Sequence, residues 1–188
     1  MSCALLLGSG LKKSFGIDKS VGIIMHQRAS HLQTAIFPNV LGLQPGTPGS
    51  KILAEGPFQL KTLYPEVTQI EKEKVKEIIQ EKDFFRIITN KNSYSSKRVV
   101  VAVGYTNNLR IKGLENFTIP HKKAKLSKDR IQLINEDHLV APGLYVAGSL
   151  AGWRSQYAIA CGSGASVATD ILTEWNQGQH TQVHDKLI

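Results

Sequence analysis

The clearest pattern in the chain is a set of short apolar runs, each ending at a glycine or a turn. Val21–Met25 (VGIIM), Arg98–Val103 (RVVVAV) and Gly143–Gly148 (GLYVAG) are nearly unbroken in apolar residues. Runs of this length with many β-branched residues are typical of strands that are covered on both faces, as in a parallel sheet. The sequence therefore predicts a buried, mainly parallel sheet.

Two segments have the composition of helices. Residues 1–9 are rich in Ala and Leu and contain no helix breaker before Gly8, which favours helix over strand. Tyr157–Trp175 follows a turn at Ser149–Ser155 and predicts a second, longer helix. Buried strands combined with helices predict an α/β domain.

The middle of the chain predicts a small antiparallel insertion. Val75–Gln80 and Phe84–Thr89 read as a hairpin that is closed by residues 81–83, and residues 66–70 form a weaker strand. Residues 26–50 and 105–138 contain many turn residues and predict loops, the first long enough to suggest a functional role. We expect one domain over residues 1–175 and a polar tail over 176–188.

Composition narrows the class of protein. The 188 residues are 41% hydrophobic, which suffices for one soluble domain with a core. No apolar run approaches the roughly 18 residues of a membrane span, so we expect a cytoplasmic protein without a membrane partner. The net charge is +8, but its basic residues are spread along the chain. We interpret them as a solvated surface and predict no nucleic-acid partner.

The cysteines and histidines suggest neither a dithiol nor a metal site. Cys3 and Cys161 lie far apart and form no CxxC motif, so a bound cofactor must carry any redox chemistry. His180 and His184 are four residues apart, but no acidic or cysteine ligand accompanies them. We therefore predict no metal.

Three segments, in this order, resemble the FAD-binding domain of the pyridine-nucleotide-disulfide oxidoreductases, in particular small thioredoxin-reductase-like proteins. Val99–Gly104 is similar to the family's apolar strand that ends in Ala-Thr-Gly. Gly143–Gly148 followed by Ser149 is similar to the strand that ends in Gly-Asp. Gln156–Ala165 is similar to the helix that begins beside the flavin ring. The resemblance implies a Rossmann-like, three-layer FAD/NAD(P)-binding domain with a small antiparallel insertion.

The resemblance also implies flavin contacts in the C-terminal half of the chain. Val103 stands where the family has Thr, and at Gly104 the backbone would pass under the cofactor. Ser149 replaces the Asp whose carboxylate bonds the ribityl chain, so it lacks charge-assisted strength. The helix start would place free N–H groups and a positive dipole end beside the reduced flavin. The implied cofactor-binding residues here are Val103, Gly104, Gly148, Ser149, Gln156, Tyr157 and Ala158.

Fainter similarities reach the N-terminal half. Phe37–Gly42 resembles the family's Asn-Tyr-Pro-Gly loop, with Asn39 as the implied flavin contact. The second strand of the family ends in an acidic residue that holds the adenosine ribose, whereas here His26 and Gln27 follow the strand. The residues that fall near the adenine contact of the family are Gln69 and Ile70.

The family's phosphate-binding fingerprint, a strand followed by GxGxxG and a helix, is missing. Gly8-Ser9-Gly10 has no third glycine at the right spacing, and Ser2–Leu7 fits better as the helix that follows the motif. We therefore expect a chain that lacks the first strand and the phosphate loop. Binding of FAD should be weak or absent in this chain and present in a longer parent. Because neighbouring strands would be left open, we expect the sheet to close up, to pair with a second copy as a homodimer, or to be poorly stable.

Two main hypotheses follow for function. The first is a thioredoxin-reductase-like, flavin-binding oxidoreductase homologue of unspecified substrate. Fewer than forty residues separate Gly104 from Gly143, too few for the family's NAD(P) domain, so a reductase partner or a dimer surface would have to supply electrons. The alternative is a non-catalytic nucleotide-binding or scaffold protein that has lost its FAD contacts. A third hypothesis is an electrostatic binding module using the basic segment His121–Arg130.

Overall fold

The computed structural model describes residues 1–26, 30–107, 109–181 and 183, so Gln27 and His184 lie outside the described residues. The backbone divides into two compact units. The first unit comprises Met1–Ile23, Gln27–Ile70 and Ala168–Ile188. The second unit comprises Ile24–His26 and Glu71–Val167. Each unit has its own hydrophobic core.

The first unit is built on two helices, α1 (Ser2–Gly10) and α2 (Gly49–Leu63). Helix α1 confirms the helix predicted at the start of the chain. Its buried Ala4 packs in one cluster with Leu60 of α2 and with Val67. Gly10 lies against Leu172, where a β-carbon would collide with the leucine side chain. Small residues on α1 therefore let the helices of this unit approach closely.

Helix α2 was not predicted from the sequence. Gly56 and Pro57 interrupt its middle, and both residues disfavour a helix interior. The helix nevertheless continues past them, and the Pro57 carbonyl oxygen accepts a hydrogen bond of 3.0 Å from the Gln69 side chain. Packing of Leu60 in the core outweighs the poor local propensity.

The segment predicted as a long functional loop, residues 26–50, contains short ordered elements before α2. Between Ser30 and Gly49 the described elements are η2 (His31–Thr34), β2 (Ile36–Phe37) and β3 (Thr47–Pro48), with β2 and β3 paired antiparallel. Elsewhere in or next to the first unit are η1 (Ser14–Gly16), β1 (Gly22–Met25) and β4 (Thr68–Glu71). Strand β1 pairs with β4, which confirms both predicted strands.

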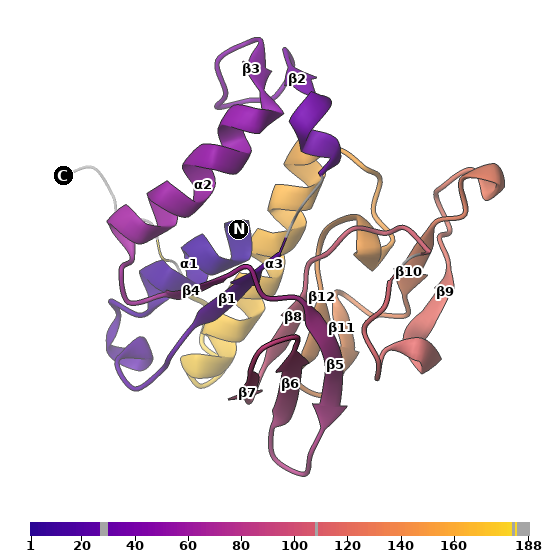
Figure 1. Cartoon of the computed structure of the whole chain (residues 1–188). Helices are drawn as coiled ribbons and strands as arrows, with labels where there is room; N and C mark the ends of the chain where they lie inside the picture. Colours follow the sequence, from indigo (N-terminus) through magenta and orange to yellow (C-terminus); the bar gives the residue numbers. More distant parts are fainter. Residues whose placement is uncertain (27–29, 108, 182, 184–188) are drawn as a thin grey trace. The chain divides into compact units, whose positions relative to one another are not determined.

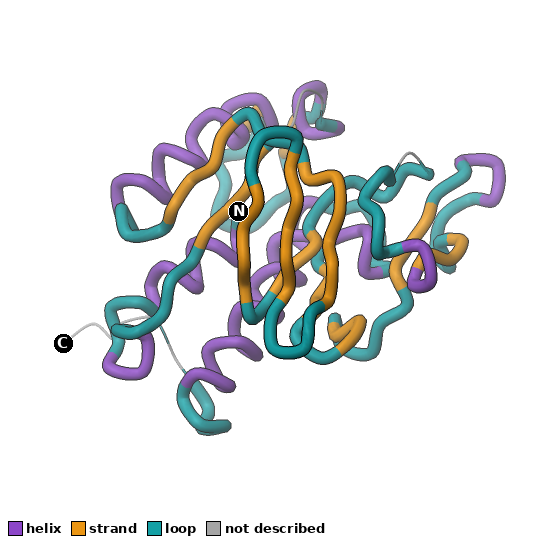
Figure 2. The backbone as a smooth tube through the Cα atoms, turned by 60° about the horizontal axis from the view of Figure 1, so that its bottom comes forward, coloured by secondary structure: helices purple, strands orange, loops and turns teal. Residues whose placement is uncertain are grey.

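The second unit contains the predicted antiparallel insertion (Figures 1 and 2). Its strands are β5 (Val75–Gln80), β6 (Phe85–Thr89) and β7 (Ser93–Ser96). The hairpin of β5 and β6 is confirmed, whereas β7 was not predicted, because its sequence SYSS has little apolar character. Alternate residues of β6 are buried, as expected of a sheet with one covered face.

A second sheet of this unit contains the parallel pair that the apolar runs predicted. Its strands are β8 (Val99–Val101), β11 (Leu139–Ala141) and β12 (Leu144–Val146). Strand β12 lies between β8, to which it is parallel, and β11, to which it is antiparallel. Leu144, Val146 and Val101 enter the main core cluster together with Phe85 and Leu133.

The remaining elements lie between these strands and at the C-terminal end. They are η3 (Glu115–Phe117), β9 (Thr118–Pro120), η4 (Leu126–Lys128), β10 (Ile131–Leu133), η5 (Gly148–Ala151) and α3 (Tyr157–Trp175). Helix α3 has the predicted bounds, whereas β9 and β10 form a hairpin within a predicted loop (Figure 1). Within the described part of the chain, none of the helices has the length and apolar character needed to cross a membrane.

A buried carboxylate stabilises one end of the antiparallel sheet. Glu73 is only 6% exposed and accepts hydrogen bonds from three side chains: Thr89 at 2.7 Å, Asn92 at 2.7 Å and Tyr94 at 3.0 Å. The hydrogen bond from Thr89 is the main cause that lowers the pKa of Glu73 below its ordinary value, against the opposing effect of burial. The fold therefore favours the ionised form of Glu73.

We predict that Glu73→Gln lowers the stability of the chain at neutral pH. The lowered pKa means that the stabilisation is fully present above the unfolded-state value of about 4.3 and is lost as the pH falls through the folded-state value. Urea unfolding should therefore show a lower midpoint for the variant at about pH 7 and a smaller difference at about pH 3. The exposed Glu71→Gln is the matched control. An equal effect in both variants would contradict this role of Glu73.

Gly113 fixes a segment that runs beside β5. The Ile78 N–H donates to the Lys112 carbonyl oxygen at 2.9 Å, and the Lys112 N–H donates to the Lys76 carbonyl oxygen at 2.9 Å. Gly113 follows with φ +89°, and a β-carbon there would collide with the Ile78 carbonyl oxygen. Only glycine combines this backbone conformation with so close an approach.

We expect Gly113→Ala to destabilise the chain by about 2 kcal/mol or more, since it adds left-handed strain to a backbone collision. Gly162→Ala is the control, because a β-carbon at Gly162 meets nothing within 4 Å and the residue lies inside a helix. That variant should be neutral or stabilised by up to about 1 kcal/mol. Thermal unfolding of both variants, followed by circular dichroism, gives the comparison. Equal unfolding midpoints would contradict the requirement for glycine at position 113.

Candidate functional site

The candidate site lies in the second unit, where the parallel strands β8 and β12 end. The Ala147 N–H donates to the Val101 carbonyl oxygen at 3.0 Å, so the chain leaves both strands at one edge of the sheet. Beyond β8, Val103 and Gly104 are exposed. Beyond β12, the chain enters the tight turn η5 at Gly148. Ligands of open α/β sheets bind at this carboxyl edge, so the edge is the first place to seek a site.

Gly148 is tied to helix α3 by a short hydrogen bond. Its φ is +77°, a conformation that favours glycine, and its N–H donates to the Ser163 hydroxyl at 2.7 Å. Ser163 is buried, and Ala160 lies 3.9 Å from where a β-carbon of Gly148 would be. The turn after β12 and the first turns of α3 therefore form one connected structure.

His138 contacts the Ser163 hydroxyl that accepts this hydrogen bond from Gly148. It is 6% exposed, and its Nδ1 lies 3.1 Å from the Val146 carbonyl oxygen and 3.4 Å from the Ser163 hydroxyl. A carbonyl oxygen can only accept, so Nδ1 carries the proton in this arrangement. The ring therefore bridges the end of strand β12 and the serine that holds Gly148.

His121 holds the other side of the turn. The Lys123 N–H donates to its Nδ1 at 3.1 Å, which leaves Nε2 as the protonated nitrogen of the neutral ring. Nε2 donates to the Ser149 carbonyl oxygen at 3.0 Å. The ring is 6% exposed and stacks edge-on against Tyr105, with centroids 5.3 Å apart. The start of the loop that joins β9 to β10 is thereby bonded to the turn at Ser149.

Trp153 provides an aromatic surface next to this turn. Its side chain is 43% exposed. The Lys123 ammonium lies 4.4 Å from the ring centroid, and the His138 ring lies 6.1 Å away at an angle of 40°. A cation and a second ring thus orient the indole and leave part of it open to a ligand.

The start of helix α3 presents small residues to solvent. Ala158, Ala160 and Gly162 are exposed, and no atom lies within 4 Å of a β-carbon built at Gly104 or Gly162. The first N–H groups of any helix lack acceptors within the helix and lie at the positive end of its dipole. A flat ligand with a negatively charged edge could therefore approach the backbone closely at this surface.

Two ionisable groups near helix ends remain protonated at neutral pH. Burial and a hydrogen bond with Cys161 raise the pKa of Tyr157 to about 12. In the first unit, burial raises the pKa of Cys3 to about 11, so that thiol is unreactive. Neither group supplies a base or a thiolate near neutral pH.

The structure brings together most of the residues predicted in the C-terminal half. Gly148 and Ser149 lie in η5, which Ser163 bonds to α3, and Gln156, Tyr157 and Ala158 form the start of that helix. Val103 and Gly104 leave the strand that is paired with β12. His26, also assigned to the second unit, is half-buried just after β1. A flavin contact by any of these residues stays a prediction.

The other predicted residues belong to the first unit, apart from Gln27, which lies outside the described residues. Asn39 is exposed between β2 and β3. Gln69 and Ile70 lie in β4, and the Gln69 amide is already bonded to the Pro57 carbonyl oxygen. That bond leaves less of the Gln69 side chain available for a ligand. Their assignment as contacts to adenosine stays a prediction.

Sequence reasoning missed the residues that support the turn. Ser163 falls within the predicted helix segment Gln156–Ala165 without a role of its own, and His121 is predicted only as part of a basic segment. His138 and Gln132 carried no signal at all, although the Gln132 side chain accepts from the Lys122 N–H at 2.8 Å and packs on Gly152. These roles depend on contacts between residues far apart in sequence.

These residues suit one part of a flavin dinucleotide. The Ser149 hydroxyl matches a ribityl chain. The backbone at Gly148 and the N–H groups at the start of α3, which a ligand can approach closely, match a flavin ring. The chain offers no GxGxxG loop for a diphosphate. The site therefore fits the flavin end of FAD and does not fit its diphosphate in the usual way.

Comparison with known proteins supports the fold. No family sequence model matches the chain, and no curated protein matches it in sequence. Among solved structures, a thioredoxin reductase from Gloeobacter violaceus matches with a TM-score of 0.69 at 10% identity, covering 100% of this chain and 93% of that chain. The thioredoxin reductase of T. acidophilum matches with a TM-score of 0.63 at 13% identity, covering 92% of this chain and 94% of that chain.

A ferredoxin-flavin thioredoxin reductase from Clostridium acetobutylicum also matches, with a TM-score of 0.64 at 13% identity and 93% coverage of both chains. These identities are low, and the similarity lies in the course of the backbone. The resemblance seen in the three sequence segments is thereby confirmed at the level of the fold. The chain has the Rossmann-like α/β fold of thioredoxin reductases.

Proposed function

We propose that this chain is a thioredoxin-reductase-like, flavin-binding oxidoreductase homologue whose flavin binds at the turn Gly148–Ser149 and the start of helix α3. One observation carries the proposal: the Gly148 N–H bonded to the Ser163 hydroxyl at the carboxyl edge of the parallel strands. That bond sets a glycine turn against a helix start that presents exposed small residues. The similarity of fold to thioredoxin reductases supports the same assignment.

Each part of the site has a separate role in this proposal. The Ser149 hydroxyl bonds a ribityl hydroxyl, while His121 holds the Ser149 backbone in place. The N–H groups at the start of α3 face the pyrimidine edge of the flavin and stabilise negative charge there. A bound flavin would supply the redox chemistry, since Cys3 and Cys161 form no dithiol.

The electron source in this proposal is a separate protein. Fewer than forty residues join Gly104 to Gly143, and in the structure they form η3, η4 and the β9–β10 hairpin rather than a second nucleotide-binding domain. A reductase partner or a second copy of the chain would then deliver electrons to the flavin. The identity of the substrate is left open by the residues of the site.

A non-catalytic nucleotide-binding or scaffold protein is the second candidate. Two observations favour it: Ser149 stands where the family has a carboxylate, and the chain has no GxGxxG loop. The two candidates differ in one measurable property. An oxidoreductase must bind flavin with a saturable affinity, whereas a scaffold need not bind it at all.

We predict that the chain binds flavin weakly, and that its affinity for FAD is little higher than its affinity for riboflavin. Because no glycine loop grips the diphosphate, the adenosine diphosphate part should improve affinity by no more than about tenfold, or about 1.4 kcal/mol. Quenching of flavin fluorescence on titration with the purified chain gives both dissociation constants, which we expect in the micromolar range or weaker. Stoichiometric flavin in the purified protein would contradict weak binding, and no saturable binding of either flavin would favour the scaffold.

Ser149→Asp should strengthen flavin binding. A carboxylate accepts a hydrogen bond from a ribityl hydroxyl with about twice the strength of a neutral oxygen, so we expect a gain of about 1 kcal/mol, or roughly fivefold in affinity for riboflavin. Ser166→Asp is the matched control, because it adds the same charge at an exposed position of α3. The same titration measures both variants. Equal changes in the two would count against a ribityl contact at Ser149.

A further inference from the structure

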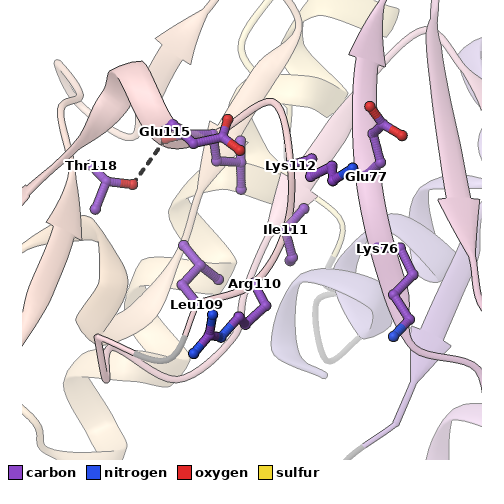
Figure 3. A pocket seen from close by; sticks show the side chains of 9 residues that line it. Lys76, Glu77, Leu109, Arg110, Ile111, Lys112, Glu115 and Thr118 are labelled. Carbon is purple, nitrogen blue, oxygen red and sulfur yellow. Dashed lines mark hydrogen bonds between the residues drawn. The ribbon is translucent and has the colours of Figure 1, made fainter.

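The second unit carries a cleft that the flavin proposal does not use (Figure 3). Its volume is about 550 Å³, within the range of small-molecule sites. It lies between the edge strand β5 and the segment that follows residue 108. The lining residues are Lys76, Glu77, Leu109, Arg110, Ile111, Lys112, Leu114, Glu115 and Thr118. None of these residues belongs to the turn at Gly148 or to helix α3.

Backbone hydrogen bonds hold together the two segments that flank the cleft. The N–H and the carbonyl oxygen of Lys112 both form hydrogen bonds with β5, and Lys112 forms a parallel bridge with Glu77. The Gly113 N–H donates to the Glu115 carboxylate at 2.7 Å, and the Thr118 hydroxyl donates to the Leu114 carbonyl oxygen at 2.9 Å. The cleft is thus largely preorganised.

Charge in the cleft is separated into two ends. In Figure 3 the Arg110 guanidinium and the Lys76 ammonium lie at one end of the cleft, on opposite walls, and the carboxylates of Glu77 and Glu115 lie at the other end. The Lys112 side chain extends toward Glu77. Glu115 already accepts from the turn at Gly113. Lys76 and Arg110 therefore form the end that is open to an anion.

These cations have no carboxylate partner in the described part of the chain. The ion pairs there do not involve Lys76, Arg110 or Lys112. Lys76 and Arg110 belong to separate segments, β5 and the segment beside it, and the backbone hydrogen bonds of Lys112 hold these two segments together. Two unpaired cations on opposite walls of a cleft attract an anion with several oxygens.

The other residues that line the cleft indicate which chemical groups a ligand would carry besides its anionic group. Leu114 is 1% exposed and forms an apolar floor with Leu109 and Ile111. The carboxylate of Glu77 lies opposite the cationic end and can accept hydrogen bonds from hydroxyl groups. A ligand that fits both ends has an anionic group at one end and hydroxyls at the other.

We propose that this cleft binds a small organic phosphate of the sugar-phosphate class. The phosphate lies between Arg110 and Lys76, where the guanidinium donates two parallel hydrogen bonds to its oxygens. The sugar body packs over Leu109 and Ile111, and its hydroxyls donate to Glu77. This site is separate from the proposed flavin site, so it stands whether or not the chain binds flavin.

The test is an NMR titration of the whole isotope-labelled chain with ribose 5-phosphate at about 0.15 M salt, where weak surface attraction is screened. We expect saturable shifts at the amides of Glu77, Lys112 and Gly113. Ribose without phosphate should cause no such shifts. Succinate, a dianion without phosphate, should bind at least about tenfold more weakly, because it lacks the tetrahedral oxygens that Arg110 and Lys76 contact together.

Variants separate the cleft from general charge. Arg110→Ala and Lys76→Ala should each weaken binding of ribose 5-phosphate by about tenfold or more, whereas Lys82→Ala should change it by less than about twofold. Lys82 is exposed in the turn between β5 and β6, and its substitution removes the same charge as the other two variants. Two of these variants probe the cleft, so the test survives if one of them fails to fold.

Three results would overturn the proposal. The first is the absence of saturable shifts at the cleft amides. The second is equal weakening by Lys82→Ala and Arg110→Ala, which would show attraction by net charge alone. The third is binding of succinate or ribose as tight as that of ribose 5-phosphate, which would remove phosphate as the recognised group.

Discussion

The candidate site depends on the parallel pairing of β8 with β12. Because two parallel strands end at the same edge, the chain leaves Val101 and Val146 side by side, although these residues are 45 positions apart in the sequence. This pairing positions the glycine turn and the start of α3. Val101 is 4% and Val146 0% exposed, so burial of apolar side chains holds the pair together.

Hydrogen bonds among serine, histidine and backbone groups fix the turn at this edge. Ser163 accepts from the Gly148 N–H, and His121 donates to the Ser149 carbonyl oxygen. His138 reaches both Ser163 and Val146 from within the core. Among the residues that the structure describes, no buried side-chain nitrogen or oxygen lacks a hydrogen-bond partner, which avoids the large cost of an unpaired group. The arrangement holds the turn in place and leaves Ser149, the ligand contact that we propose, uncharged.

The basic residues show how tertiary structure changes the meaning of composition. Along the sequence the lysines and arginines look evenly spread, and a net charge of +8 suggests only a solvated surface. In the folded second unit, Lys76 and Arg110 line one cleft because the segment of Lys112 is bonded to β5. By contrast, Lys123 and Arg130 lie over the rings of Trp153 and Tyr105 and stabilise the loop that joins β9 to β10.

The sequence by itself determined the elements whose signal is local. The runs VGIIM, RVVVAV and GLYVAG became β1, β8 and β12, and Tyr157–Trp175 became α3 with the predicted bounds. It also placed Gly148 and Ser149 at a turn before a helix. These features depend on apolar periodicity and on glycine, which act within a few residues. Tertiary structure decided α2, which persists through Gly56 and Pro57 because Leu60 is buried, and the hairpin of β9 and β10. It also decided the bond from Gly148 to Ser163 and the cleft at Arg110, since both join residues that only the folded backbone brings together.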